Sequence, residues 1–305
     1  MEPTIHTVFE SVTCIWQYIA ADPATREAVI IDSVLDYNKE TGAIGTVSAD
    51  KLMQLVDNND YTITRILETH AHADHLTASI WLQHELSRQQ KQQPLVCIGR
   101  RITQVQKTIG LIYRIPEREM QGAFDHMLSD GERFHVGNIE AKVVYLPGHT
   151  PDHVGYIVRS NIFTGDSMFH PDLGTARCDF PGGSATELYN SMRKLLGFPG
   201  NFKLYTGHDY PPKDRRIPAG ETPGPIPYTT VESQSRKNKH VKVGTQMDQF
   251  VKMRTKRDAS LSEPTLLRQS MHVNLRGGRL PADAVEGFKI SQRPSSIPTV
   301  ASGCS

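Results

Sequence analysis

The chain has 305 residues, a formal net charge of +1 and four cysteines. This length can bury a sizeable core in one large domain or two small ones. The near-zero charge argues against an electrostatically driven nucleic-acid binder, and no apolar run approaches the roughly 20 residues that span a membrane. The cysteines form no Cys-x-x-Cys pair and the N-terminus has no leader pattern, so we expect a cytoplasmic protein.

The first part of the chain alternates short apolar runs with turns. β-branched and aromatic residues predict strands over 6–10, 14–20 and 28–32. Ser48 is a candidate N-cap for a helix with apolar residues on one face. The run 61–67 predicts a buried strand that ends in a loop.

That loop carries four ligand-type side chains within six residues: His70, His72, Asp74 and His75. Imidazole and carboxylate groups together suit zinc, iron or manganese. Spacings of one and two residues allow several of these groups to face the same ion. The loop therefore predicts a metal site.

Further ligand-type residues follow predicted strands. We expect a helix from Leu76 to about Gln89, and then a strand over 95–98 and a helix over 103–111. A strand predicted over 139–146 should end just before His149. A hairpin of strands 154–158 and 161–164 should end just before Asp166, and a strand over 203–206 just before His208. The pattern Ser184-Ala185-Thr186-Glu187 predicts a capped helix that stops at Gly197. Side chains at strand ends can converge on one point.

The composition changes after Tyr210. Prolines recur over 211–228, which predicts an extended loop near the metal face. We expect residues 1–210 to form the catalytic domain and residues 211–293 to pack on it as a C-terminal extension. The Ser- and Pro-rich end, residues 294–305, predicts a disordered tail.

His-x-His-x-Asp-His, followed in order by Gly148-His149-Thr150, Thr164-Gly165-Asp166 and Gly207-His208, resembles the signature of the metallo-β-lactamase superfamily. The resemblance implies an α/β fold, the αββα sandwich, here as a single domain with a C-terminal extension. It implies two Zn2+ ions per chain. One would be held by His70, His72 and His149 and the other by Asp74, His75 and His208, with Asp166 bridging. It also implies that Asp32 lies near the site without binding metal.

Two divalent ions held in this way would activate a water molecule for attack on a lactam, ester or thioester carbonyl of a small molecule. Asp74 would be the catalytic residue that orients this water and carries its proton. This hydrolase is the first functional hypothesis. The sequence leaves the assembly open between a monomer and a homodimer.

The second hypothesis uses fewer residues. His70, His149 and Asp166 alone form a two-histidine, one-carboxylate set of the kind that binds a single Fe2+. The segment 174–183 and the C-terminal segment 238–281 resemble the persulfide dioxygenase branch of the superfamily. This resemblance implies oxidation of glutathione persulfide to sulfite, with Arg177 binding the substrate. An ion pair between Arg177 and Asp179 is the structural alternative.

Overall fold

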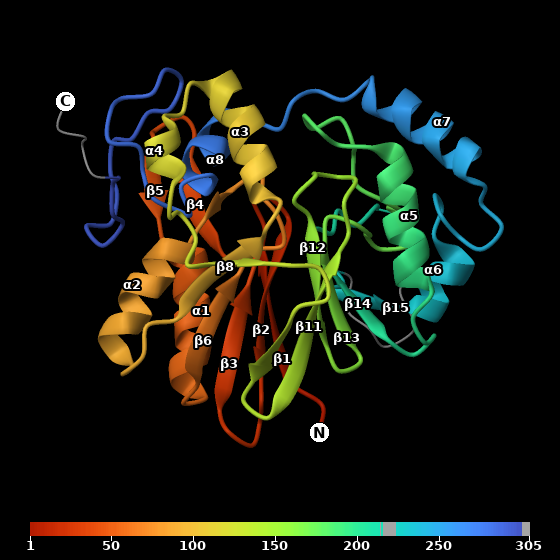
Figure 1. Ribbon diagram of the computed structural model, residues 1–305, viewed down its shortest axis with the longest axis horizontal. Coiled ribbons are helices and arrows are strands. Elements are labelled where there is room, and N and C mark those ends of the chain that lie inside the picture. The colour runs from red at the N-terminus through yellow and green to blue at the C-terminus, as the bar shows by residue number, and fades with distance from the viewer. Residues whose placement is uncertain (214, 216–223, 301–305) are drawn as a thin grey trace.

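The computed structural model describes residues 1–213, 215 and 224–300. Two six-stranded sheets face each other and helices cover their outer faces (Figure 1). This arrangement confirms the αββα sandwich. Within the described residues, no helix combines the length and the apolar character that a membrane crossing requires.

The first sheet comes from the N-terminal half of the chain. Its strands, in spatial order, are β1 (Thr4–Glu10), β2 (Ile15–Ala21), β3 (Glu27–Ile31), β6 (Thr62–Leu67), β8 (Leu95–Gly99) and β9 (His126–Leu128). β3, β6, β8 and β9 are parallel to one another, so their carboxyl ends lie at the same edge. A small sheet of β5 (Ala43–Gly45), β4 (Val34–Asn38) and β7 (Leu76–Thr77) extends beyond that edge.

The second sheet is largely antiparallel. Its strands, in spatial order, are β10 (Arg133–Val136), β11 (Ile139–Tyr145), β12 (Val154–Val158), β13 (Asn161–Gly165), β14 (Lys203–Thr206) and β15 (Tyr228–Thr230). β13 and β14 form its parallel pair, which carries Asp166 and His208 to the same end of the sheet.

The helices divide between the two sheets. They are α1 (Val47–Asn58), α2 (Ser79–Gln89), α3 (Ile102–Tyr113), α4 (Glu117–Met120), α5 (Ala185–Leu196), α6 (Val231–Lys237), α7 (Met247–Asp258) and α8 (Leu267–Asn274). Contacts join α2 to β6 and β8, and α5 to α6 and α7. In Figure 1, α5, α6 and α7 lie on the side of the second sheet, whereas α3, α4 and α8 lie at the end of the first.

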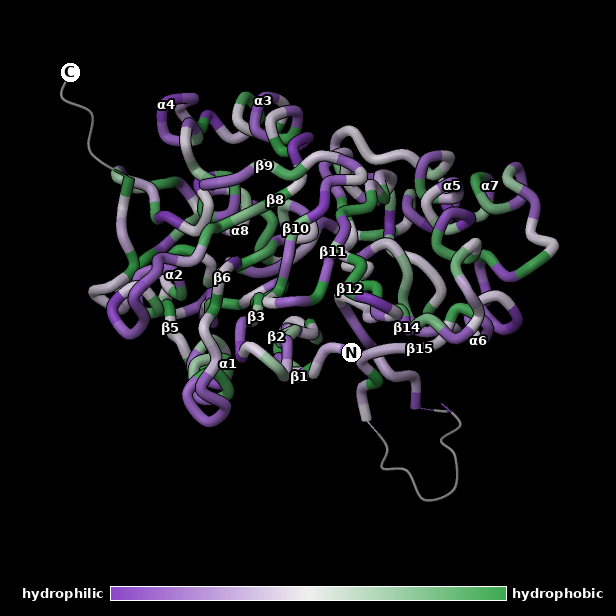
Figure 2. The backbone as a smooth tube through the Cα atoms, turned by 60° about the horizontal axis from the view of Figure 1, so that its bottom comes forward, coloured by the Kyte–Doolittle hydropathy of each residue, from purple (hydrophilic) through white to green (hydrophobic). Residues whose placement is uncertain are grey.

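Three apolar layers hold the sandwich together. Tyr18, Ile31 and Tyr156 belong to the layer between the sheets. Leu52, Leu82 and their neighbours bind helices to the first sheet, and Leu188 and Met192 of α5 pack on the second. Hydrophobic residues follow the central strands and hydrophilic residues occupy the outer turns, as Figure 2 shows. Burial of apolar area is the main stabilising contribution of these layers.

Local hydrogen bonds and strand pairing explain where the observed helices begin relative to the predicted ones. The Ser184 hydroxyl accepts a hydrogen bond from the Glu187 N–H at 3.2 Å, which confirms the predicted cap of α5. Ser48, in contrast, lies inside α1 and does not cap it. Its N–H and hydroxyl both donate to the Asp36 carboxylate instead. The helix predicted from Leu76 begins at Ser79, since Leu76–Thr77 pairs with β4 as β7.

The chain end also differs from the expected disorder over residues 294–300. Ile297 is buried in the apolar layer around α1 and α2. The N–H of Leu280 donates to the Pro298 carbonyl, and the N–H of Val300 donates to the Leu280 carbonyl, both at 3.0 Å. The buried Ile297 side chain and these two backbone hydrogen bonds thus hold the segment in place despite its Ser/Pro composition. Residues 301–305 lie outside the described part, as do Pro218 and Pro223 of the Pro-rich stretch.

Candidate metal centre

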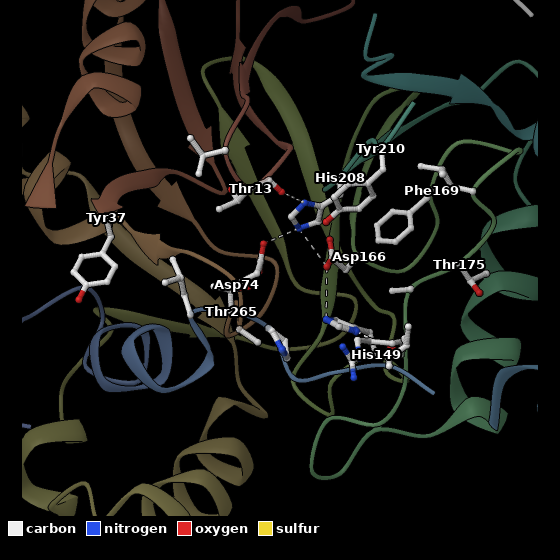
Figure 3. A pocket seen from close by; sticks show the side chains of 18 of the residues that line it. Thr13, Tyr37, Asp74, His149, Asp166, Phe169, Thr175, His208, Tyr210 and Thr265 are labelled. Carbon is white, nitrogen blue, oxygen red and sulfur yellow. Dashed lines mark hydrogen bonds and ion pairs between the residues drawn. The ribbon is translucent and has the colours of Figure 1, made fainter. Parts of the chain in front are cut away.

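The predicted ligands meet at the open end of the sandwich. The loop after β6 carries His70, His72, Asp74 and His75, and the turn after β11 carries His149. Asp166 and His208 follow β13 and β14. Figure 3 shows Asp74, His149, Asp166 and His208 pointing toward a common space. The structure thus brings together all seven residues for which the sequence predicts a metal role.

Three groups of three ligand atoms are compact enough to surround an ion; two consist of predicted ligands, and the third is Asp32, Glu68 and His72. We define the first ligand group as His70, His149 and Asp166, and the second as His72, Asp74 and His75; within each group the ligand atoms lie within 4.8 Å of one another. Every member is buried except Asp74, which is partly exposed.

His208 and Asp166 connect the two groups. His208 Nε2 lies 3.2 Å from an Asp74 oxygen and 3.5 Å from Asp166 Oδ2. The same Asp166 oxygen lies 3.6 Å from His149 Nε2. This position between the groups is consistent with the predicted bridging role of Asp166.

His72 lies at the boundary of the groups. Its ring centroid is 4.1 Å from that of His70 and 4.3 Å from that of His75. The compact groups place a ligand atom of His72 with those of Asp74 and His75, and also with those of Asp32 and Glu68, but not with those of His70 and His149. Its predicted pairing with His70 and His149 remains a prediction.

Each of the five histidines has one ring nitrogen close to a protein oxygen. His70 Nδ1 faces the Thr69 hydroxyl at 3.0 Å, and His72 Nε2 faces Asp32 Oδ1 at 3.1 Å. The other three use backbone carbonyls: His75 Nδ1 faces that of Leu76 at 3.2 Å, His149 Nδ1 that of Arg177 at 2.7 Å, and His208 Nδ1 that of Thr13 at 3.1 Å. Such contacts fix the ring and leave the opposite nitrogen free to bind a metal.

Those opposite atoms fit a metal ion. Among the described residues, four such atoms are buried without a hydrogen-bond partner: His70 Nε2, His72 Nδ1, His75 Nε2 and Asp166 Oδ1. Burying polar atoms without partners is costly. Histidine nitrogens and carboxylate oxygens converging in this way are the donor set of zinc and iron sites.

Burial and neighbouring charges shift the pKa values of the ligands in different directions. Burial, followed by the charge of His72, lowers the pKa of His75 to about 3. Burial would raise the pKa of Asp74, but the neighbouring imidazoles of His208 and His75 lower it overall. Burial would lower the pKa of His208, but Asp166 and Asp74 raise it to about 9. The ionised carboxylates thus attract positive charge, which a bound cation would supply in place of the His208 proton.

Residues around the ligands hold the loops in place. Asp32 accepts hydrogen bonds from the N–H and hydroxyl of Thr69, so it lies beside the ligands as predicted. Asp152 accepts the N–H of Ala71 at 2.8 Å. The ring of His153 stacks on that of His70 at 4.7 Å. No motif in the sequence indicates Asp152 or the buried Glu68, which lies 3.4 Å from His72 Nε2.

The ligands border a cavity of about 780 Å³. Phe169, Leu173 and Leu266 contribute apolar surface to it. Lys39, Arg177 and Arg257 contribute cationic side chains, and Glu40 contributes an anionic one. Such a cavity is large enough for a small molecule. The combination favours a ligand with both an apolar and an anionic part.

Arg177 lines this cavity and is also held by the protein. Its Nε and Nη2 donate to the two oxygens of Asp179 at 2.5 Å, and its Nη1 donates to the Ser262 carbonyl at 2.7 Å. The ion pair foreseen as a structural alternative is therefore present. A guanidinium has five N–H donors, so two remain that these three bonds do not use.

Comparison with known proteins is consistent with this architecture. No family model matches the chain. It is 41% identical to glyoxylase B2 of Dictyostelium discoideum over 91% of this chain and 92% of that protein. It is 38% identical to a probable metallo-hydrolase of Burkholderia pseudomallei over 95% and 98% of the two chains.

More distant similarity extends to persulfide dioxygenases. The mitochondrial persulfide dioxygenase ETHE1 of Bos taurus is 27% identical over 90% of this chain and 88% of its own. The solved structure of ETHE1 from Myxococcus xanthus has a TM-score of 0.69 and 27% identity, covering 90% of this chain and all of that one. The sandwich, the ligand clusters and these relatives together show that the chain is a metal-binding enzyme of the metallo-β-lactamase superfamily.

Proposed function

We propose that the chain is a metal-dependent hydrolase that attacks a lactam, ester or thioester carbonyl of a small molecule. One observation carries this proposal: five imidazoles, spread over both ligand groups and His208, each have one nitrogen fixed by a protein oxygen. A single ion bound by the first group would use only His70 and His149, so the fixed orientation of the other three imidazoles would not serve metal binding. Two divalent ions would supply a polarised carbonyl and a nucleophilic hydroxide near neutral pH.

The residues of the chain have distinct roles in this proposal. His70, His72 and His149 would hold one ion and Asp74, His75 and His208 the other, with Asp166 between them. Asp74 is the partly exposed ligand, and its side chain lines the cavity. Its carboxylate is therefore available to orient the attacking water and accept its proton.

The cavity narrows the substrate class. Lys39 and Arg257 offer positive charge on the cavity wall in addition to Arg177. Phe169 and Tyr210 provide apolar surface next to His208. An anionic thioester or ester matches this distribution better than a neutral lactam, because charge-assisted hydrogen bonds are stronger than neutral ones.

A second candidate, a mononuclear Fe2+ persulfide dioxygenase, is favoured by a specific contact. The segment 174–183 resembles the persulfide dioxygenase branch, and within it the backbone carbonyl of Arg177 accepts the Nδ1 hydrogen bond of His149 at 2.7 Å. This segment therefore both lines the cavity and orients a member of the first group. The reaction would convert a persulfide, O2 and water into the thiol, sulfite and two protons. The cationic wall would suit glutathione persulfide equally well.

One experiment separates the two candidates. Protein purified without added metal is analysed for zinc and iron, and is then supplied with an acidic thioester and, separately, with glutathione persulfide in an oxygen electrode. The hydrolase proposal expects about two zinc ions, thiol release and no oxygen uptake. One iron ion with sulfite formation and no hydrolysis would overturn it in favour of the dioxygenase.

A further inference from the structure

A buried side-chain amide from the C-terminal extension forms hydrogen bonds to the backbone of the metal-ligand loop. Asn274, at the end of α8, is 4% exposed. Its Nδ2 donates to the backbone carbonyls of His72 and His75, both at 2.8 Å. Its Oδ1 accepts the N–H of Thr77 at 2.9 Å. One side chain thus joins both ends of the second ligand group.

A buried ion pair from α7 acts on the other group. Arg254 is 1% exposed and pairs with Asp258. Arg254 Nη1 donates to the Thr175 carbonyl at 3.2 Å, and Asp258 Oδ2 accepts the N–H of Cys178 at 2.8 Å. These two backbone contacts lie on either side of Arg177.

The segment between those contacts reaches a predicted metal ligand. The carbonyl of Arg177 accepts the Nδ1 hydrogen bond of His149 at 2.7 Å. His149 Nε2 is the ring nitrogen that faces Asp166. Displacing the Arg177 carbonyl would therefore change the ring orientation of a member of the first ligand group.

We propose that the C-terminal extension carries two separate clamps for the metal centre. Asn274 is a positioning residue for the second ligand group, and the Arg254–Asp258 pair is a positioning element for His149 in the first. Neither clamp has a side-chain atom within hydrogen-bonding distance of a ligand side chain among the described contacts. The proposal concerns how ligands are held, so it applies to either reaction.

The variants follow from the geometry. Asn274→Asp keeps the shape but replaces the Nδ2 donor by an oxygen that faces two carbonyl oxygens. Arg254→Lys keeps the positive charge but lacks the planar group that reaches Asp258 and Thr175 together. Gln83→Glu is the matched control: Gln83 is a buried amide of α2 that donates to the Pro94 carbonyl and to Asp125, away from the ligands.

Hydrogen exchange on the full-length, metal-free proteins tests the clamps without relying on any activity. Asn274→Asp should speed amide exchange in peptides covering residues 70–77 and leave residues 174–180 unchanged. Arg254→Lys should have the opposite effect, and Gln83→Glu should change neither. Asn274→Ala, which adds no charge, replaces Asn274→Asp if that protein does not fold.

Zinc binding provides the second readout. In dialysis against buffered Zn2+, each clamp variant should bind one ion about 10- to 100-fold more weakly, as expected when a group that orients ligands is lost. Gln83→Glu should bind as the wild type does. Unchanged local exchange together with unchanged zinc affinity would overturn the proposal. So would faster exchange spread equally over both segments, since that would show a general loss of stability.

Discussion

The two ligand groups differ in how the chain assembles them. The second group comes from one loop, with His72, Asp74 and His75 within four consecutive positions. The first group joins three segments, because His70 follows a strand of the first sheet whereas His149 and Asp166 follow strands of the second. The first group therefore exists only when the two sheets are packed together. A bound ion there should couple metal binding to the stability of the whole sandwich.

Removing a member of the first group should have the largest effect. His70→Ala deletes a ligand that both proposed reactions need, so bound metal should fall and activity should drop to background. Metal analysis and an assay of the same preparation check this. A metal-free preparation of His70→Ala with wild-type activity would contradict the metal mechanism altogether.

Metal removal should reveal the coupling between the first group and the fold. Binding to the folded state alone stabilises it by about 4 kcal/mol when the free ion is at 1,000 times its Kd. Chelation should therefore lower the Tm by several degrees, and His149→Ala should lose most of this difference. Calorimetry with verified metal loss is the measurement. An unchanged Tm would mean that joining the two sheets through an ion adds nothing to stability.

Arg177 should have an intermediate effect because it lies between the cavity and the first group. Arg177→Ala should cost about 1.5–3 kcal/mol of charge-assisted hydrogen bonding to an anionic substrate, or roughly a 10- to 100-fold fall in kcat/KM. A small neutral lactam should be affected much less. Arg177→Lys, which retains the charge, should recover part of the loss. Equal losses for both substrates would indicate that Arg177 acts only through the loop that it holds.

The smallest effect is expected at His240, which lies against the cavity residue Thr175. Burial, followed by the charges of Arg254, Lys239 and Arg257, lowers the pKa of His240 to about 4. Its neutral Nδ1 accepts the N–H of Thr175 at 3.1 Å.

Between pH 6.5 and about 4, the unfolded chain binds a proton at His240 that the folded chain does not. The stability contributed by this group is thus present above pH 6.5 and is lost as the pH falls toward 4. In urea unfolding, His240→Gln should lose less free energy of unfolding over this range than the wild type. Parallel curves for the two proteins would contradict this assignment.

The same contrast explains what could be predicted from the sequence. The second group lies within one motif, so its residues were found from local spacing alone. The first group was found because each ligand follows an apolar strand, and strand ends meet at one edge of a sandwich. The resemblance to the superfamily then indicated which strand ends to combine.

Other features could not be read from the sequence because they depend on tertiary contacts. Asn274 holds a loop about 200 positions earlier in the chain, and nothing in its own neighbourhood indicates this. Leu76 fits an amphipathic helix, but pairing with β4 gives a strand instead. Residues 294–300 have the composition of a disordered tail, but the burial of Ile297 and two backbone hydrogen bonds with Leu280 hold them in place.

The metal content and products of Asp74→Ala test the central claim most directly. Asp74 belongs only to the second group, and the account requires both groups to act together. The wild type should bind two zinc ions and hydrolyse an acidic thioester, whereas Asp74→Ala should bind one ion and lose most of the hydrolysis. One iron ion in both proteins, with oxygen uptake on glutathione persulfide retained in Asp74→Ala, would contradict the account.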